Sequence, residues 1–337
     1  MENNNSIYVW RVIFTYIIAL HHLRNCFGQT TYWYIAVDFF AIISGTLMVS
    51  HINRVNDNET TWDYIIKKFW QFSPLIIVTS LIRLLVEVYY NPLSLSTIIS
   101  KILFAIPDFL LINSYYIGGS LNSVDWYIQM LFTLSIPLYY LLKNNKDFTV
   151  NFVAPVFCLM VYSYIFNEFH YLEGYVAQKK ILQGVINLPL LRIGGGVFLG
   201  VLCYYWIPKI KKINSKIRMF IECVSLVSVI LFSKFWGKNS VELLYIIVLF
   251  VGIAFAFTHR VKLPSLIYQF IQYLSGLSIY IYLSHYILRI IFRNEFSDYD
   301  FRLVIFYLLC CTFFSVILQY TLKVLNRNFQ SVKIIKK

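Results

Sequence analysis

Charged residues are scarce in this chain. Only 13% of its 337 residues are Asp, Glu, Lys or Arg, whereas 59% are hydrophobic and 19% are aromatic. About a quarter of the residues of a typical soluble domain are charged, so this composition excludes an ordinary soluble protein. No polar block is long enough to fold as a separate soluble domain, because apolar runs of membrane-spanning length recur throughout. The sequence therefore predicts one polytopic membrane domain over residues 1–337.

Three further features are missing. The six cysteines lie in or beside apolar runs without metal-ligand spacing, which predicts free thiols and no metal site. There is no internal repeat, which removes a simple argument for an inverted-repeat transporter. The first apolar stretch lacks a small-residue cleavage site and contains charged side chains, so we expect a retained span rather than a signal peptide, with the mature chain beginning near Met1.

The apolar runs predict an all-α integral membrane protein with about ten transmembrane helices in a single bundle. The predicted spans are 7–26, 32–50, 68–90, 124–142, 150–167, 183–205, 217–234, 240–257, 266–290 and 301–323. The segment 97–117 is also apolar but contains Pro107 and Asp108, so we expect an interfacial or re-entrant piece there.

The net charge of +13 is spread over short loops, which is typical of membrane orientation and argues against nucleic-acid binding. Basic residues on one side of the predicted spans include Arg54, Lys67, Lys68, Lys143, Lys146, Lys209, Lys211, Lys212, Lys216, Arg218 and Arg260. The positive-inside rule places this side in the cytoplasm. We therefore expect a multi-pass protein of the cell membrane, surrounded by lipids, with both termini cytoplasmic.

Arg11 and His22 both lie in the first predicted span, with ten residues between them. A helix turns through roughly 1100° over that distance, so the two side chains project from nearly the same face. Ionisable side chains inside a membrane usually face the bundle interior or a water-filled path. His22 suits a general base because the unperturbed pKa of histidine lies near neutrality. An intramembrane histidine can also simply form a hydrogen bond to a neighbouring helix.

Other polar residues fall at the same depth as His22. The topology puts Asp38 and His285 in the outward part of the membrane and Asp125 and Trp126 at the outer mouth of the fourth span. A carboxylate such as Asp38 could orient and polarise the His22 imidazole. We therefore expect one polar layer supplied by several helices.

A second polar station lies at the inward end. The Arg11 guanidinium suits a phosphate, although snorkelling to the headgroups explains its position equally well. We interpret Lys67 and Lys68 first as positive-inside anchors and only secondarily as phosphate ligands. Arg192 lies too deep in its span to snorkel, so we expect a polar cavity or a buried carboxylate partner for it.

Small and aromatic residues have a structural interpretation. Gly194, Gly195, Gly196 and Gly200 contain a small-xxx-small spacing that favours close helix packing. Tyr280, Tyr282 and Tyr286 suit interfacial belts and helix contacts, although rings at an outer mouth also suit sugar stacking.

These residues resemble a known family in both order and placement. Arg11 to His22 has the form R-x10-H, and Val37-Asp38-Phe39-Phe40 followed by Ser44-Gly45 is similar to the VDFFFxxSG run of the membrane acyltransferase-3 proteins. Trp126-Tyr127-Ile128 resembles the family's tryptophan motif, and LSGLSIYIYLSH, ending at His285, resembles its late signature. The resemblance covers almost the whole chain.

The resemblance implies transfer of an acyl group, often acetyl, from cytoplasmic acyl-CoA to a hydroxyl of a surface polysaccharide or related glycan. It makes Arg11 and His22 the core functional pair. The chain departs from the family where Lys67 and Lys68 replace an arginine-rich segment, because lysine lacks the bidentate fork of arginine. No appended esterase-like domain follows, so we expect this domain to deliver the acyl group directly.

The expected mechanism places CoA phosphates near Arg11, Lys67 and Lys68 and the thioester near His22, oriented by Asp38. Asp125, Trp126, Arg192 and His285 would shape or support the acceptor end. His22 either deprotonates the acceptor hydroxyl or carries the acyl group itself. The acceptor could be a surface polysaccharide or a lipid-linked glycan. The rival interpretation is a transporter or flippase for such a glycan, which would consume no thioester.

Overall fold

The computed structural model describes residues 5–55, 59–112, 120–173, 188–261 and 263–335. Helices account for 81% of the structure, and the described residues contain no strand. The predicted all-α class is therefore confirmed. All six cysteines are free thiols, as the sequence predicts.

The helices follow one another along the chain in three groups. The first are α1 (Asn5–Cys26), the 3₁₀ turn η1 (Trp33–Ile35), α2 (Ala36–Ile52), α3 (Thr61–Tyr90), α4 (Leu95–Phe104) and α5 (Ile106–Phe109). The middle of the chain forms α7 (Trp126–Asn144), α8 (Lys146–Phe148), the π-helical turn η2 (Thr149–Val153), α9 (Ala154–Glu168) and α10 (Leu188–Ile210). The last are α11 (Ser215–Phe232), α12 (Val241–Ala256), α13 (Ser265–Gly276), α14 (Ser278–Glu295) and α15 (Phe301–Ile335).

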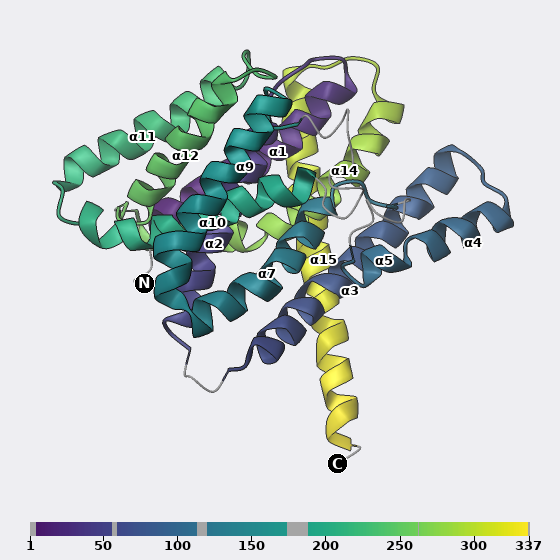
Figure 1. The fold of residues 1–337 in the computed structure, drawn as a ribbon. Coiled ribbons are helices and arrows are strands. Elements are labelled where there is room, and N and C mark those ends of the chain that lie inside the picture. The colour runs from purple at the N-terminus through teal and green to yellow at the C-terminus, as the bar shows by residue number, and fades with distance from the viewer. Residues whose placement is uncertain (1–4, 56–58, 113–119, 174–187, 262, 336–337) are drawn as a thin grey trace.

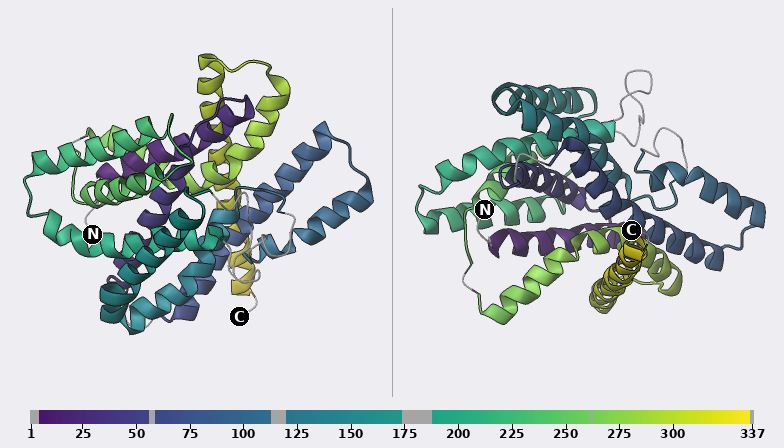
Figure 2. Two further views of the ribbon diagram at one scale, coloured as in Figure 1. Left: turned by 45° about the horizontal axis from the view of Figure 1, so that its top comes forward. Right: turned by 90° about the horizontal axis from the view of Figure 1, so that it is seen from below.

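The helices α2 and α10 cross in the middle of the bundle (Figure 1). Helices α7, α9 and α12 pack against α10, and α14 packs against α1, α3 and α15. The α11–α12 hairpin forms one flank, and the end of α3 with α4 and α5 forms an arm on the opposite flank (Figure 2). The last turns of α15 extend beyond the bundle (Figure 1).

The predicted count of about ten spans is not confirmed. Six helices are long and apolar enough to cross a membrane, and α13 with α14 makes a seventh if the bent pair is one span. Those six are Ser6–Cys26, Trp33–Ile52, Thr61–Tyr90, Lys146–Glu168, Leu188–Ile210 and Phe301–Val324. The predicted spans 217–234 and 240–257 do contain helices, but α11 carries Lys216, Arg218 and Glu222, and α12 has only 16 residues. The predicted start of the sixth span, 183–187, lies outside the described residues.

The segment 97–117 contains two short helices. Helix α4 has 10 residues and α5 has four, so neither can span a membrane, and residues 113–117 lie outside the described part of the chain. No side chain of α4 is buried, and the exposed side chains include the apolar Leu95 and Leu103. Such a surface suits contact with lipid. An interfacial location for this arm stays a prediction.

The predicted span 266–290 is divided into two helices rather than continuous. Helices α13 and α14 meet at an angle of 61°, with Gly276 ending the first. The amide of Leu277 donates to the carbonyls of Tyr273 and Leu274, which closes α13 before α14 begins. Glycine favours such a break because it is a poor helix former. Irregular backbone at membrane depth is tolerated where it lines a cavity, and Gly276 and Ser278 both do so.

Small residues let α2 and α10 approach closely. A Cβ added at Gly45 would lie 1.9 Å from the Val197 carbonyl oxygen, and one added at Gly200 would lie 2.0 Å from the Ile42 carbonyl oxygen. The Thr46 hydroxyl donates across the same contact to the Gly200 carbonyl at 2.9 Å. The packing role predicted for the glycines of α10 is therefore confirmed, with Gly45 as the matching residue on α2.

The first turns of α1 are fixed by a buried acid. The indole Nε1 of Trp10 donates to a carboxylate oxygen of Glu222 at 2.6 Å, and the Phe14 ring stacks on Phe39 with centroids 3.9 Å apart. These contacts join α1 to α11 and α2. They set the rotation of α1 and hence the direction in which Arg11 projects.

The close α2–α10 contact gives a stability prediction. We expect Gly200→Ala to destabilise the protein more than Gly194→Ala, because the new methyl group would meet backbone at Gly200 but the movable Phe157 ring, 3.0 Å away, at Gly194. Overpacking of a core costs about 1–3 kcal/mol. Thermal unfolding in detergent measures the difference, and equal midpoints for the two variants would contradict the packing argument.

Candidate functional site

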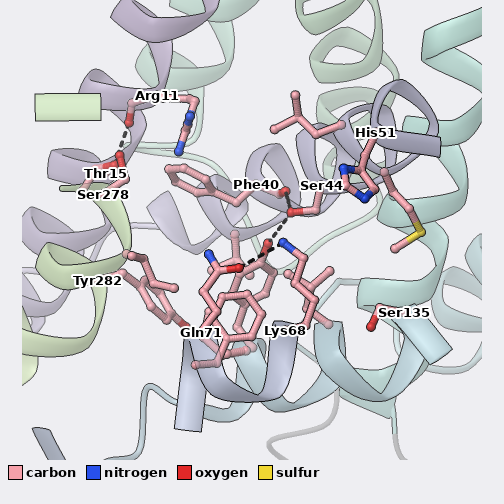
Figure 3. Close-up of a pocket in the computed structure, with 18 of the residues that line it drawn as sticks. Arg11, Thr15, Phe40, Ser44, His51, Lys68, Gln71, Ser135, Ser278 and Tyr282 are labelled. Atoms are coloured by element: carbon pink, nitrogen blue, oxygen red, sulfur yellow. Dashed lines mark hydrogen bonds between the residues drawn. The ribbon is translucent and has the colours of Figure 1, made fainter. Parts of the chain in front are cut away.

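A cavity of about 470 Å³ lies between α1, α2, α3, α7 and the junction of α13 and α14. Its polar lining consists of Arg11, Thr15, Ser44, His51, Arg54, Tyr64, Lys68, Gln71, Tyr127, Ser135, Ser278 and Tyr282. Its other lining residues are Ile18, Val37, Phe40, Leu47, Met48, Phe72, Ile128, Leu131, Gly276 and Ile279. Arg11 reaches the cavity from α1 on one side, and Lys68 and Gln71 reach it from α3 on the other (Figure 3).

The charge of this cavity has one sign. Arg11, Arg54 and Lys68 line it together with the half-buried His51, and none of the described lining residues is acidic. Uncompensated cations in a concave, mostly apolar site attract an anion. The cavity therefore offers cationic groups that can bind an anion beside apolar walls.

Arg11 is poised for a ligand. Its buried Nε has no hydrogen-bond partner among the described residues, and its guanidinium forms no ion pair with them. The Thr15 hydroxyl donates to the Arg11 backbone carbonyl at 2.6 Å, which leaves the guanidinium group uninvolved. An arginine inside a membrane bundle is costly without a partner. An anionic ligand would supply that partner.

The structure separates the two neighbouring lysines. The Lys68 ammonium lies in the cavity, where it donates to Gln71 at 3.1 Å and lies over the Tyr64 ring. The Lys67 side chain is 70% exposed, lies outside the cavity and contacts Glu59 at 3.3 Å. Of the two predicted donor-site lysines, only Lys68 lines the cavity.

Glu59 ties together the loop beside the cavity. Its carboxylate accepts hydrogen bonds from His51 Nε2 at 2.7 Å and from the Tyr139 hydroxyl at 2.8 Å. Partial burial opposes ionisation of this carboxyl, but the bonds from Tyr139, His51 and Lys67 outweigh it and lower the pKa of Glu59. The ionised carboxylate therefore holds His51, which lines the cavity.

Two of the predicted histidines meet. The His22 and His285 rings lie 5.0 Å apart between centroids, although they come from α1 and α14. His285 Nδ1 lies 3.2 Å from the Ile281 carbonyl, which can only accept, so this nitrogen carries the proton. Its buried Nε2 has no hydrogen-bond partner among the described residues and is left as an acceptor. No group of three or more metal-ligating side chains occurs in the described part of the chain.

The histidine pair lies just beyond one end of the cavity. Tyr282 lines the cavity, and its ring centre is 5.9 Å from that of His285. Ile18, which also lines it, precedes His22 by one helical turn. The cavity therefore connects the cations near Lys68 with the neighbourhood of His22.

The expected pair between Asp38 and His22 is not formed. Both Asp38 oxygens instead accept from Arg192, at 3.1 Å from Nε and 2.6 Å from Nη2, and both side chains are fully buried. Such a bidentate pair is the strongest way to hold a buried carboxylate. Arg192 thus has the buried carboxylate partner expected for it, while Asp38 joins α2 to α10 and is not available to orient His22.

The expected outer layer is only partly assembled. Asp125 is buried and accepts from the Ser120 hydroxyl at 3.0 Å. Asn122 in the same loop donates to the Leu283 carbonyl, two residues before His285. Trp126 is half-buried, with its ring 6.3 Å from that of Tyr127, and neither Asp125 nor Trp126 lines the cavity. Asn122 therefore ties the loop before α7 to α14.

Sequence reasoning missed a cationic cluster beside the histidines. The Tyr286 ring meets His22 edge-on at 5.5 Å, and the guanidinium groups of Arg289 and Arg83 lie 4.7 and 5.7 Å from its centre. Arginines in two predicted spans were a usable signal, because each needs a polar environment inside a membrane. Nothing in the sequence pattern indicates that they share one tyrosine.

The architecture and the cavity define a multi-pass helical membrane protein with an anion-attracting interior site. The sequence profile of the acyltransferase-3 family, described as an acyltransferase domain, matches residues 4–323. The chain therefore belongs to this family of membrane acyltransferases. No curated protein and no solved structure matches the chain.

The buried Asp38–Arg192 pair gives a second prediction. Removing one partner leaves the other charge buried, which costs about 3–5 kcal/mol, whereas replacing both with apolar residues is often close to neutral. We expect Asp38→Leu and Arg192→Met each to lower the thermal unfolding midpoint in detergent strongly, and the double variant to recover much of the loss. A double variant as unstable as the sum of the singles would argue against direct pairing.

Proposed function

We propose that the protein is a membrane O-acyltransferase that moves an acyl group, most simply acetyl, from acyl-CoA to a hydroxyl of a surface polysaccharide or lipid-linked glycan. The observation that carries the proposal is the cationic cavity, which is lined by no acidic residue among those described and ends beside the histidine pair, in a member of an acyltransferase family.

The cavity suits the shape and charge of a CoA thioester. The phosphates would bind to Lys68, Arg54 and Arg11, which line the cavity. The pantetheine arm would lie along apolar walls such as Phe40 and Met48. Charge-assisted hydrogen bonds to phosphate are about twice as strong as neutral ones, so the cations would supply much of the affinity. Lys67 takes no part in this site.

The proposed orientation puts the Lys68 end of the cavity in the cytoplasm, where acyl-CoA is found. Lys143 and Lys146 lie at the same end, because Lys143 donates to the Glu59 carbonyl and Lys146 to the Asn53 side chain. Such a basic surface is typical of the cytoplasmic side of a membrane protein. The His22 end then faces outward, and both termini are cytoplasmic.

His22 is the proposed general base. It takes the proton of the acceptor hydroxyl as the oxygen attacks the thioester carbonyl carbon, and a new C–O ester bond forms. The C–S bond then breaks, and the CoA thiolate leaves with the proton returned by His22. No oxidant or metal is needed. The products are a glycan ester and free CoA.

His285 would hold the reactive tautomer of His22. Its Nε2 is an unused acceptor, so a small turn of the His22 ring lets one His22 nitrogen donate to it while the other faces the acceptor. Asp125 and Trp126 would support this end through the loop before α7, in which Asn122 donates to the Leu283 carbonyl of α14. The same geometry allows a second route, in which His22 carries the acyl group transiently. Rapid quenching with labelled acetyl-CoA distinguishes the two by trapping labelled protein only in the second.

The separation of the two lysines gives a prediction for the donor. We expect Lys68→Ala to raise the KM for acetyl-CoA about tenfold, the loss of one charge-assisted contact, and to leave the acceptor KM unchanged. Lys67→Ala is the matched control, since Lys67 lies outside the cavity, and should behave like the parent protein. Steady-state transfer of labelled acetyl groups in membranes measures both constants. Equal effects of the two variants would remove the cavity as the donor site.

His22 gives the central prediction. We expect His22→Asn to reduce transfer of labelled acetyl from acetyl-CoA to surface glycans by about 10²–10⁴-fold, because a general base contributes that much. His170→Asn, at an exposed histidine after α9, should leave transfer unchanged. The product is counted as alkali-labile label in the glycan. If the parent protein moves the glycan across the membrane of reconstituted vesicles without consuming thioester, the transporter alternative replaces this function.

A further inference from the structure

A second, smaller cavity of about 150 Å³ lies at the other end of α1 from Arg11. It is assembled from separate parts of the chain: His21 and Asn25 near the end of α1, Thr31 and Tyr34 around η1, Glu173 after α9 and Lys238 between α11 and α12. Its floor is buried at His21, Thr31 and Tyr34, while Asn25 and Lys238 at its mouth are exposed. The cavity therefore opens at the His22 end of the bundle.

One face of α1 connects this cavity to the donor cavity. Arg11, Thr15 and Ile18 line the donor cavity, and His21 and Asn25 line the second one. At about 100° per residue these positions share one broad face of the helix, on which His22 also lies. The His21 and His22 ring centres are 5.1 Å apart. His22 therefore lies next to both cavities.

The lining of the second cavity differs from that of the first. It has one carboxylate, one ammonium group, an amide, hydroxyls and a tyrosine ring, whereas the donor cavity is acid-free and cationic. Opposite charges, hydroxyls and an amide suit a neutral ligand with several hydroxyl groups. Burial raises the pKa of the Glu173 carboxyl because the ionised form loses hydration, and a ligand hydroxyl that donates to the carboxylate would offset part of that cost. The volume admits one sugar-sized ring and not a CoA.

The walls are held in place before any ligand binds. Glu242 is buried and accepts from the Tyr34 hydroxyl, from the Lys238 amide at 2.5 Å and from the Leu172 amide at 2.7 Å. His21 Nδ1 lies 3.0 Å from the Thr31 hydroxyl. Preorganised walls reduce the entropy cost of binding. This favours a binding site over an incidental gap between helices.

We propose that this cavity is the acceptor subsite: it binds one hydroxylated, uncharged sugar residue of the acceptor glycan and directs a hydroxyl past His21 to His22. The proposal rests on the proposed acyltransferase function and adds where the acceptor binds and what class of acceptor is accepted. The donor and acceptor then approach His22 from opposite ends of α1.

The kinetic test uses the full chain in nanodiscs, with labelled acetyl-CoA and methyl glycosides of glucose, galactose and N-acetylglucosamine as acceptors. We expect Asn25→Ala and Glu173→Gln each to raise the acceptor KM about fivefold to tenfold, the loss of one or two hydrogen bonds, with the acetyl-CoA KM unchanged. Asn294→Ala, an exposed asparagine near the end of α14, is the matched control. Unchanged acceptor constants in both cavity variants would overturn the subsite.

A binding measurement separates failure of this subsite from failure of the proposed function. Thr30 is exposed and lines the cavity, so Thr30→Cys can be labelled with a membrane-impermeant maleimide, with the parent protein giving the background of native thiols. We expect the glycosides to slow this labelling, and Asn25→Ala to remove the protection. Protection without any acetyl transfer would keep the subsite and reject the donor assignment. Acetyl transfer without protection from labelling would keep the function and reject the subsite. The subsite would also be rejected if Arg289→Gln changed the acceptor KM and the cavity variants did not.

Discussion

The buried ion pair between Arg192 and Asp38 is the interaction on which the rest of the structure depends. It joins the two central helices where small residues already bring their backbones together at Gly45 and Gly200. Arg192 also donates to the Tyr34 carbonyl at 3.1 Å, so the same guanidinium fixes η1. Helix α2 presents one wall of the donor cavity and η1 part of the smaller cavity. Both sites are therefore positioned from one charged contact.

The two arginines that the sequence singled out show how far sequence reasoning extends. Arg11 and Arg192 have the same signal, a guanidinium inside an apolar run, and sequence alone predicts only that each needs a polar environment. Their partners decide their roles, and these are set by tertiary packing. Asp38 lies 154 positions from Arg192 in the chain, and it neutralises that arginine, while Arg11 has no acid beside it among the described residues. Periodicity on one helix cannot reveal a carboxylate supplied by another.

The same limit applies to the fold and to the rest of the site. Helix content and the packing role of the glycines follow from local composition and spacing, so both were predictable. The 61° bend after Gly276 was not predictable, because the apolar run continues across it and the cavity that makes the break tolerable is formed by tertiary packing. Shared depth put His22 and His285 in one expected polar layer, and helix packing brings their rings together. The pairing of Asp38 with Arg192 instead of His22 could not be predicted, because depth in the membrane does not determine which side of a helix faces which neighbour.

The acid-free lining of the larger cavity has a consequence for turnover in the proposed reaction. Its cations would contact the phosphates, a part of the donor that the reaction leaves unchanged, so spent CoA would be held almost as firmly as acyl-CoA. Product and donor would then compete on nearly equal terms, and the rate would follow the ratio of acylated to free CoA in the cell rather than the donor concentration alone. Modification of the acceptor would thereby report the metabolic supply of acyl groups.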